Sequence, residues 1–480
     1  MTAEAAGGRG ARIAWLAFAV LVSAATLVAL AEWVRALALR GPVLYGEGAV
    51  AHAALLARDG VEYVTGAAVV AGPLRPIFTA ANYPPLYFRL AGLGDPFIVG
   101  RAVSIAATIA VAAAIVWRAR RGGPVVALAL GAGWIATFPV AVWGPAVKPD
   151  LVALALTVGG VLTIAAGPRR AFAAGILLAL AVWTKPTELL PAAALLAWCI
   201  TQGRRALLGY VAGGAAGLVV ASIVLMGPGF PLVGGKAFLV HVVTWNALPW
   251  SAEQVGLLAF VGAATLGATI GAAILLREYE GPLLAYALGG LGVLVLGGRE
   301  GATVNYLLDL SAAAALALAS AAPRLRALPA YPVAATVQLA LTVALLDPFA
   351  LVPGGLPRTG AWGDPARLDV VRDLPAGPAL VEDSGLLVGA GREPVVDDLF
   401  LWSRLEEASS GGPSFAEGPR LIEAVAARRF TTIASETDLE RLDAAPAYER
   451  ARWAPDLVRV VLEGYVLDHR VGALWFYRRR

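Results

Sequence analysis

Long uninterrupted runs of hydrophobic residues alternate with short polar segments through the first 346 residues of the chain. A helix needs about 20 such residues to cross a membrane. The pair of runs around residues 171–201 is short enough to form either two tilted helices or a re-entrant hairpin. The pattern predicts about eleven spans, over residues 13–31, 97–117, 124–142, 151–166, 171–184, 188–201, 206–226, 255–276, 282–297, 303–322 and 330–346.

The pattern changes after Leu346. Short strand-like runs at Ala379–Glu382 and Phe430–Ile433 alternate with helical stretches such as Pro419–Arg429, which is typical of a small α/β domain. Of the 34 acidic residues, 13 lie in residues 1–346 and 21 follow. We therefore predict a mainly α, polytopic membrane bundle over residues 1–346 and a soluble α/β domain over residues 347–480. Four acidic residues of this domain are expected on its solvated surface: Asp383, Glu393, Asp397 and Asp398.

Composition supports the membrane assignment and excludes several classes of protein. Of the 480 residues, 59% are hydrophobic and 15% are charged, and the mean hydropathy of +0.72 is too high for a soluble protein of this length. A single cysteine, Cys199, and three histidines exclude a disulfide framework and a Cys- or His-rich metal cluster. The net charge of +4 comes from arginines that flank spans, so it gives no reason to expect a nucleic-acid partner.

These arginines orient the chain. Counted from a cytoplasmic N-terminus, every short basic cluster falls on the cytoplasmic side, as the positive-inside rule requires. The groups are Arg9 and Arg12, then Arg118, Arg120 and Arg121, then Arg169 and Arg170, then Arg204 and Arg205, then Arg277, and finally Arg324 and Arg326. With eleven spans, the C-terminal domain is then extracytoplasmic.

The opposite side collects the charged loops that are candidates for chemistry. It carries nearly all acidic residues of the membrane part and the only three lysines, Lys148, Lys185 and Lys236. Glu47, between two glycines, begins a predicted short helix that ends at Gly60. Ionisable groups near a membrane interior are costly and often functional. Any single loop residue can also be polar simply because it is exposed to water.

Several short motifs occur in one order. They are the acidic loop at Glu47, the turn Asn82-Tyr83-Pro84-Pro85-Leu86-Tyr87, Arg101 with Ser104, Trp143-x(4)-Lys148-Pro149-Asp150, Thr184-Lys185-Pro186-Thr187, and Gly301-Ala-Thr-Val-Asn-Tyr-Leu-Leu-Asp309. In this order the chain resembles polytopic membrane glycosyltransferases of the GT-C superfamily. The resemblance is to an uncharacterised bacterial branch near the protein mannosyltransferase-like and aminoarabinose transferase-like enzymes, and it covers most of residues 10–346.

The resemblance implies a GT-C bundle in a bacterial plasma (inner) membrane that moves a sugar from a polyprenyl-phosphate-linked donor to an extracytoplasmic acceptor. The acceptor is a glycan, a lipid or a protein, and the transfer is expected to be inverting. Glu47 matches the family's acidic first-loop residue and is the expected general base. Many members carry Asp, or two acids close together, where this chain has only Glu47. Asp150 is the candidate second carboxylate, and whether a divalent metal takes part stays open. Expected substrate-binding residues are His52, Tyr83, Arg101, Lys148, Asp150, Lys185, His241, Asn246, Arg299, Glu300, Asn305 and Asp309.

Three of these residues also fit a purely structural role. Arg101 either holds a lipid phosphate or extends its side chain to the membrane interface. Asn305 and Asp309, four residues apart on a predicted helix, either bind sugar hydroxyls on one face or join helices. A polytopic transporter or flippase for a lipid-linked or sugar substrate is the alternative function, although we find no inverted repeat in the sequence.

Overall fold

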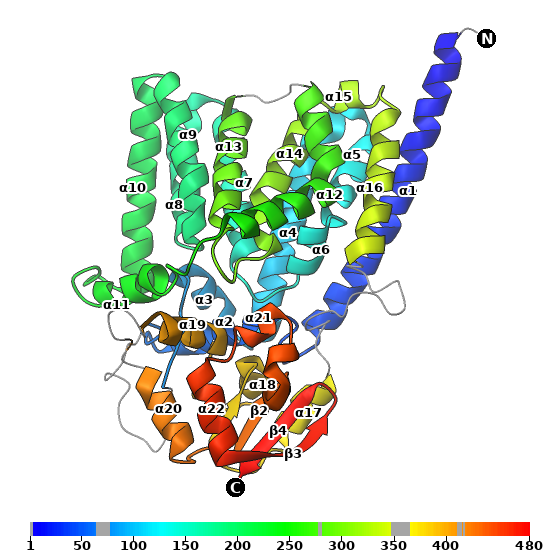
Figure 1. The fold of residues 1–480 in the computed structure, drawn as a ribbon. Coiled ribbons are helices and arrows are strands. Elements are labelled where there is room, and N and C mark those ends of the chain that lie inside the picture. Colours follow the sequence, from blue (N-terminus) through cyan, green and yellow to red (C-terminus); the bar gives the residue numbers. More distant parts are fainter. Residues whose placement is uncertain (1–2, 64–76, 277–280, 347–364, 410–414, 416–417) are drawn as a thin grey trace. The chain divides into compact units, whose positions relative to one another are not determined.

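The computed structural model describes residues 3–63, 77–276, 281–346, 365–409, 415 and 418–480 (Figure 1). Its chain divides into two compact units. We call Met1–Arg35, Ala102–Pro228 and Pro249–Pro357 the membrane unit, and Ala36–Arg101, Gly229–Leu248 and Arg358–Arg480 the C-terminal unit. The predicted boundary at residues 346/347 lies at the edge of residues 347–364, which are outside the described part of the chain, and it stays a prediction.

The membrane unit is helical, and each predicted span corresponds to helical structure. Among the described residues, four helices are long and apolar enough to cross a membrane, and the other apolar helices are shorter. The α-helices are α1 (Ala3–Leu37), α4 (Pro96–Ala119), α5 (Pro124–Ile135), α6 (Phe138–Trp143), α7 (Asp150–Ala165), α8 (Ala171–Val182), α9 (Leu189–Thr201), α10 (Arg204–Met226), α12 (Ala252–Leu276), α13 (Gly281–Leu296), α14 (Leu308–Ser320), α15 (Ala322–Leu325) and α16 (Ala330–Leu346). Short 3-10 turns lie between them: η2 (Arg120–Gly122), η3 (Pro168–Arg170), η4 (Pro186–Glu188) and η6 (Val304–Leu307).

The pair around residues 171–201 forms two separate helices, α8 and α9. In contrast, the span predicted over residues 124–142 is interrupted, because α5 ends at Ile135 and α6 begins at Phe138. Pro139 has no backbone N–H to continue the α5 hydrogen-bond ladder. The remaining predictions differ from the helices mainly at their ends.

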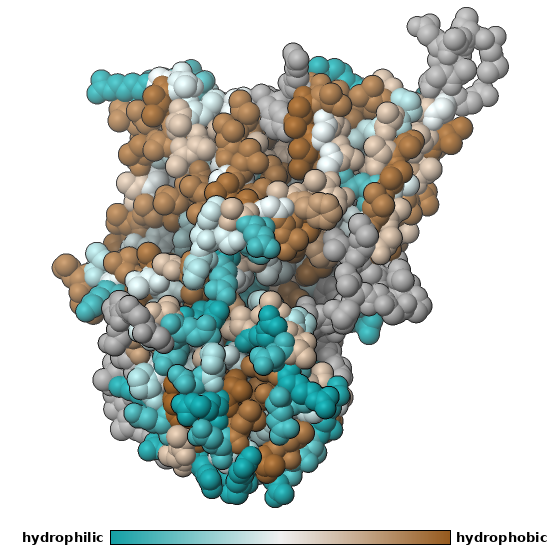
Figure 2. Space-filling model, viewed as in Figure 1, coloured by the Kyte–Doolittle hydropathy of each residue, from teal (hydrophilic) through white to brown (hydrophobic). Residues whose placement is uncertain are grey.

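Small residues let the helices of this unit approach closely. A Cβ atom at Gly213 of α10 would collide with the backbone carbonyl of Phe172 in α8, and one at Gly175 would collide with the carbonyl of Tyr210. Close backbone contact of this kind replaces the hydrophobic effect where the solvent is lipid. Outward-facing side chains are correspondingly apolar (Figure 2), including Val20, Val224, Phe260 and Leu275.

The C-terminal unit contains a four-stranded sheet in the order β1-β2-β4-β3. β1 (Ala379–Val381) pairs in parallel with β2 (Thr432–Ser435), with Leu380 opposite Ile433. β4 (Leu474–Arg479) runs antiparallel to β2 and to β3 (Tyr465–Val471). The sequence predicted β1 and β2 but not the β3–β4 hairpin. The helical elements are α2 (Glu47–Arg58), α3 (Pro85–Ala91), α11 (Gly235–Leu239), η5 (Val240–Thr244), α17 (Pro365–Arg372), α18 (Ser384–Gly389), α19 (Leu399–Ser409), α20 (Gly418–Ala426), η7 (Leu439–Ala444), α21 (Ala447–Arg450) and α22 (Pro455–Gly464).

The core of this unit draws on all three of its chain segments. Phe78 and Trp245 lie 4.9 Å apart between ring centroids and share one buried cluster with Trp402, Ile433 and Tyr477. Phe78 also forms an isolated parallel bridge with Val396. The segments Ala36–Arg101 and Gly229–Leu248 therefore complete the hydrophobic core around the sheet.

Candidate functional site

Glu47 begins α2, and the backbone around it explains why. Gly46 precedes it with a φ of 78°, a left-handed conformation that glycine adopts without strain. The Glu47 side chain is fully buried. Its Oε2 atom accepts a hydrogen bond from the backbone N–H of Val43 at 2.7 Å and an ion-paired hydrogen bond from Arg101 at 2.8 Å. The same carboxylate oxygen therefore accepts two hydrogen bonds.

Arg101, at the start of α4, is held by more than Glu47. Its guanidinium also donates to the backbone carbonyls of Ala36, Leu39 and Gly41 at 2.9, 2.6 and 2.6 Å. The side chain has no solvent exposure, so the interpretation that it extends to the membrane interface is wrong. Its predicted contact with a lipid phosphate stays a prediction.

His52, on the next turns of α2, pairs with Asp397. His52 Nδ1 lies 3.0 Å from Asp397 Oδ2, and the other oxygen of Asp397 accepts the Ala80 N–H at 2.8 Å. Burial raises the pKa of Asp397, and the hydrogen bond with His52 limits that rise. The expectation that Asp397 and Asp383 lie on a solvated surface is wrong, because both are buried. A carboxylate with matched donors can be buried without a prohibitive cost.

Two further predicted residues, His241 and Asn246, join the turn at residues 80–83 to the 241–246 segment, and a third, Tyr83, lies in that turn. His241 is buried against Trp245, with ring centroids 4.2 Å apart, and its Nδ1 accepts the Ala81 N–H at 3.2 Å. Asn246 donates to the Asn82 carbonyl at 2.9 Å. The carbonyl of Tyr83 accepts from the Tyr63 hydroxyl at 2.7 Å. These contacts hold the Pro84-Pro85 turn in place.

In the membrane unit, three of the sequence motifs meet at Asp150. One carboxylate oxygen, Oδ1, lies 2.7 Å from Lys185 Nζ and accepts from Asn305 Nδ2 at 2.7 Å. The other, Oδ2, accepts from the indole N–H of Trp143 at 3.1 Å. Asp150 is 2% exposed. The tryptophan and the aspartate of the Trp-x(4)-Lys-Pro-Asp motif are therefore direct partners, and the other two motifs supply the ammonium and the amide.

Aromatic and cationic groups extend this cluster. Lys185 Nζ lies 5.0 Å from the centroid of the Tyr306 ring, a cation–π distance. Arg299 donates to the Tyr306 hydroxyl at 3.1 Å, and Thr303 donates to the side-chain oxygen of Asn305 at 2.9 Å. We call Trp143, Asp150, Lys185, Asn305 and Tyr306 the Asp150 cluster.

Two more carboxylates are buried beside it. Glu188, 1% exposed, accepts from the Thr157 hydroxyl at 2.8 Å, and Asp309, 2% exposed, accepts from the Tyr286 hydroxyl at 3.1 Å. Lys185 acts electrostatically on both. The residues predicted from the sequence did not include Glu188, although it lies three residues after Lys185 in the same turn.

Asn305 and Asp309 do not form the expected helical pair. Residues 304–307 form the 3-10 turn η6 and α14 begins at Leu308, so the two side chains bind different partners.

Lys148 and Glu300 are only partly buried, as is Arg299. The carbonyl of Lys148 accepts from Ser104 at 3.3 Å, and the backbone N–H of Glu300 donates to the Pro249 carbonyl at 2.8 Å.

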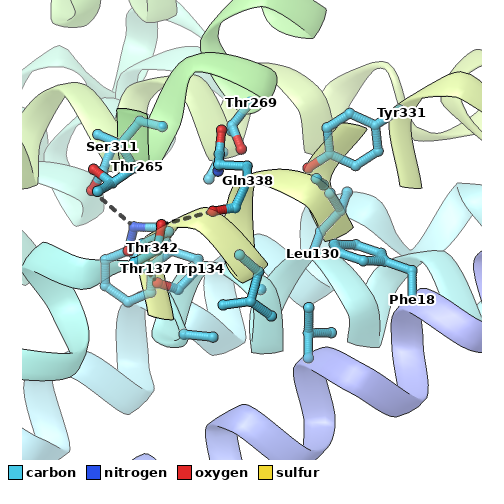
Figure 3. Close-up of a pocket in the computed structure, with 17 residues that line it drawn as sticks. Phe18, Leu130, Trp134, Thr137, Thr265, Thr269, Ser311, Tyr331, Gln338 and Thr342 are labelled. Carbon is cyan, nitrogen blue, oxygen red and sulfur yellow. Dashed lines mark hydrogen bonds between the residues drawn. The ribbon is translucent and has the colours of Figure 1, made fainter. Parts of the chain in front are cut away.

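A small cavity between helices of the membrane unit is polar on one side (Figure 3). Trp134 donates to the Ser311 hydroxyl at 3.1 Å. The Thr342 hydroxyl donates to the backbone carbonyl of Gln338 at 2.8 Å. None of the predicted site residues lines this cavity.

Among the described residues, no group of three or more His, Cys, Asp or Glu side chains is arranged to hold a metal ion.

No protein-family model matches the sequence, and no curated protein matches it. Solved structures do match the fold. A crystal structure of ArnT, an aminoarabinose transferase, from Cupriavidus metallidurans bound to undecaprenyl phosphate aligns with a TM-score of 0.55 and 15% identity, over 95% of this chain and 97% of that one. The apo structure of the same protein aligns with a TM-score of 0.56 and 14% identity, again over 95% of this chain and 97% of that one.

An oligosaccharyltransferase from Archaeoglobus fulgidus in the apo form aligns less well, with a TM-score of 0.46 and 13% identity over 92% of this chain and 73% of that one. ArnT is a GT-C glycosyltransferase. The expected fold class, a membrane helical bundle with a small C-terminal α/β domain, is confirmed. This chain therefore has the fold of the GT-C membrane glycosyltransferases.

Proposed function

We propose that this protein is a membrane glycosyltransferase that moves a sugar from a polyprenyl-phosphate-linked donor to an acceptor on the extracytoplasmic face of a bacterial plasma membrane. The observation that carries the proposal is the alignment of 95% of the chain with ArnT bound to undecaprenyl phosphate. Two buried polar clusters, around Glu47 and around Asp150, support it, because buried ionisable groups in a membrane protein are expensive and usually functional.

In the proposed reaction, an acceptor hydroxyl oxygen attacks the anomeric carbon of the donor. The bond from that carbon to the phosphate oxygen breaks, and the phosphate leaves on the polyprenyl chain as an anion. The hydroxyl proton passes to Glu47, which becomes protonated. Attack opposite the leaving phosphate inverts the configuration at the anomeric carbon.

The contacts of Glu47 suit a proton acceptor. A general base must be held in a fixed position, and Glu47 Oε2 accepts hydrogen bonds from both Arg101 and the Val43 N–H. The three backbone carbonyls that hold Arg101 also fix its position. Arg101 is therefore proposed to orient Glu47, in addition to its predicted contact with the phosphate.

The membrane unit offers cations for the leaving phosphate. Lys148, Lys185 and Arg299 are the candidates, since fixed positive charge where negative charge develops lowers a reaction barrier. Lys185 is positioned by Asp150 and Tyr306. The remaining polar residues of this unit are proposed to bind sugar hydroxyls, directly or by orienting these cations: Asp150, Asn305, Asp309 and Glu300.

The test uses purified full-length protein in lipid nanodiscs with a panel of polyprenyl-phosphate sugars and a bacterial extract of glycans, lipids and proteins as acceptors, and measures release of polyprenyl phosphate. Glu47→Gln should lower that release at least about 100-fold. Asp59→Asn, an exposed change at the end of the same helix, is the matched control and should leave it unchanged. Full activity in Glu47→Gln would remove Glu47 as the base, and intact donor that crosses liposome membranes would instead support a flippase.

A further inference from the structure

A second cleft lies in the membrane unit, away from the Asp150 cluster. It has a volume of about 600 Å³ and lies between the beginning of α1, the turn from η2 into α5, and α15. None of its lining residues belongs to the predicted catalytic or substrate-binding set. Its size falls in the range of cavities that bind small molecules.

Two arginines line this cleft from different helices. Arg12 belongs to α1 and Arg326 follows α15, and both are exposed. Neither forms an ion pair within the described part of the chain. The guanidinium of Arg326 reaches the turn before α5, where its Nη1 atom would lie 3.7 Å from a Cβ atom on Gly123.

The N-terminus of α5 opens onto the same cleft. This helix has twelve residues, begins at Pro124, and is preceded by Gly123 with a φ of 95°. The first backbone N–H groups of a helix have no partner within it and favour anions. Val125 and Val126, the second and third residues of α5, line the cleft.

An independent observation also points to a missing polar partner. Trp15 lines the cleft and is only 3% exposed. Its indole N–H is buried and has no hydrogen-bond partner among the described residues. A buried donor without an acceptor is costly, so a polar ligand in the cleft that reaches this N–H would relieve that cost.

The surroundings of the cleft indicate what kind of anion it takes. Ile13 and Leu16, beside Arg12 on α1, are 61% and 53% exposed, and α1 is one of the helices able to cross a membrane. Acyl chains can cover these apolar side chains while the phosphate meets the arginines. We propose that this cleft binds the phosphodiester headgroup of an anionic phospholipid, at the arginine-bearing end of the bundle.

Native mass spectrometry of the purified full-length protein tests the proposal. The protein is mixed in turn with phosphatidylglycerol, with phosphatidylcholine and with inorganic phosphate. We expect bound phosphatidylglycerol in excess over phosphatidylcholine. The double variant Arg12→Gln/Arg326→Gln should bind it about 25-fold more weakly, since each arginine near an anionic lipid contributes about fivefold.

Two further variants separate charge from general damage. Arg12→Lys/Arg326→Lys keeps the charges and should retain most of the binding. Arg169→Gln/Arg170→Gln removes two exposed arginines that do not line the cleft and should bind as the wild type does. Equal loss in this control, unchanged binding in the Arg12/Arg326 glutamine variant, or phosphate that binds as well as the lipid would each overturn the proposal. The proposed sugar transfer does not depend on this cleft.

Discussion

The two units bury their candidate site residues in different ways. In the C-terminal unit, Glu47 is matched by one arginine, and backbone carbonyls satisfy most of the remaining guanidinium donors. In the membrane unit, Asp150 is held by side chains alone, drawn from three separate segments. A cluster made of side chains depends on the position of every segment that carries them. The backbone carbonyls around Arg101 all belong to one short segment, residues 36–41. The Asp150 cluster should therefore be the more sensitive of the two to single substitutions.

The largest effect on stability is expected for Asp150→Ala. The change leaves the Lys185 ammonium buried without its carboxylate, and breaking a buried ion pair in this way typically costs about 3–5 kcal/mol. Thermal unfolding in detergent, followed by size-exclusion chromatography, measures the loss. The double variant Asp150→Ala/Lys185→Met should recover part of it. A double variant no more stable than Asp150→Ala would contradict the comparison.

Glu47→Gln should separate activity from stability. The glutamine carbonyl can still accept from Arg101 and from Val43, and three backbone carbonyls still accept from Arg101, so the unfolding temperature should fall less than in Asp150→Ala. Polyprenyl phosphate release should fall about 100-fold, equivalent to about 2.7 kcal/mol. The same preparation is used for both measurements. A large fall in the unfolding temperature with proportionate loss of activity would instead assign Glu47 a structural role.

A smaller effect is expected for Thr157→Val beside the Asp150 cluster. The substitution keeps the shape of the side chain but removes the hydroxyl that donates to Glu188. Interhelical hydrogen bonds in membranes contribute about 0.6–1.7 kcal/mol. Equilibrium unfolding in mixed micelles should show a loss within that range. Thr201→Val, which removes an exposed hydroxyl whose hydrogen bonds stay within its own turn, is the control and should be close to neutral.

The C-terminal unit offers a pH test of buried charge. Burial, with repulsion from Glu436, raises the pKa of Asp383 to about 7, against the partial compensation of Arg367. Because the folded state holds this proton more tightly than the unfolded state, the contribution of Asp383 to stability should be greatest below about pH 4 and should decline as the pH rises to 7. The slope is at most about 1.4 kcal/mol per pH unit.

Asp383→Asn should flatten that decline while keeping the cap of α18, since asparagine also accepts the Gly385 N–H. Tryptophan fluorescence melts at pH 5, 6 and 7 compare the variant with the wild type. Asp369→Asn, an exposed neighbour, is the control. An unchanged slope in Asp383→Asn would show that other carboxylates carry the pH dependence.

Much of the fold could be predicted from the sequence because lipid imposes a simple rule. A long apolar run inside a membrane must be helical, because its backbone polar groups can form hydrogen bonds only within the segment. This rule located the spans. The break at Pro139 explains why one predicted span covers two helices. The β3–β4 hairpin was missed. Tyr465 is the only buried residue among the seven of β3, so the hydrophobic alternation is weak in this strand.

The candidate site was predictable as a set of motifs but not as a set of contacts. Charge pattern and resemblance selected Asp150, Lys185 and Asn305. That all three meet in one cluster follows from helix packing, since Asn305 lies 155 residues from Asp150 along the chain. Asp397 shows the same limit, because its partner His52 is 345 residues away.

The sequence by itself determined which part of the chain faces lipid and which faces water, where the helical spans lie, and which ionisable side chains stand at their ends. Hydropathy and charge are local properties that act on each segment in isolation. The tertiary structure alone decided which ionisable groups lose their water and which partner replaces it. That choice depends on distance between side chains, so a carboxylate such as Asp397 has the same sequence signature whether it is solvated or, as here, buried against a histidine.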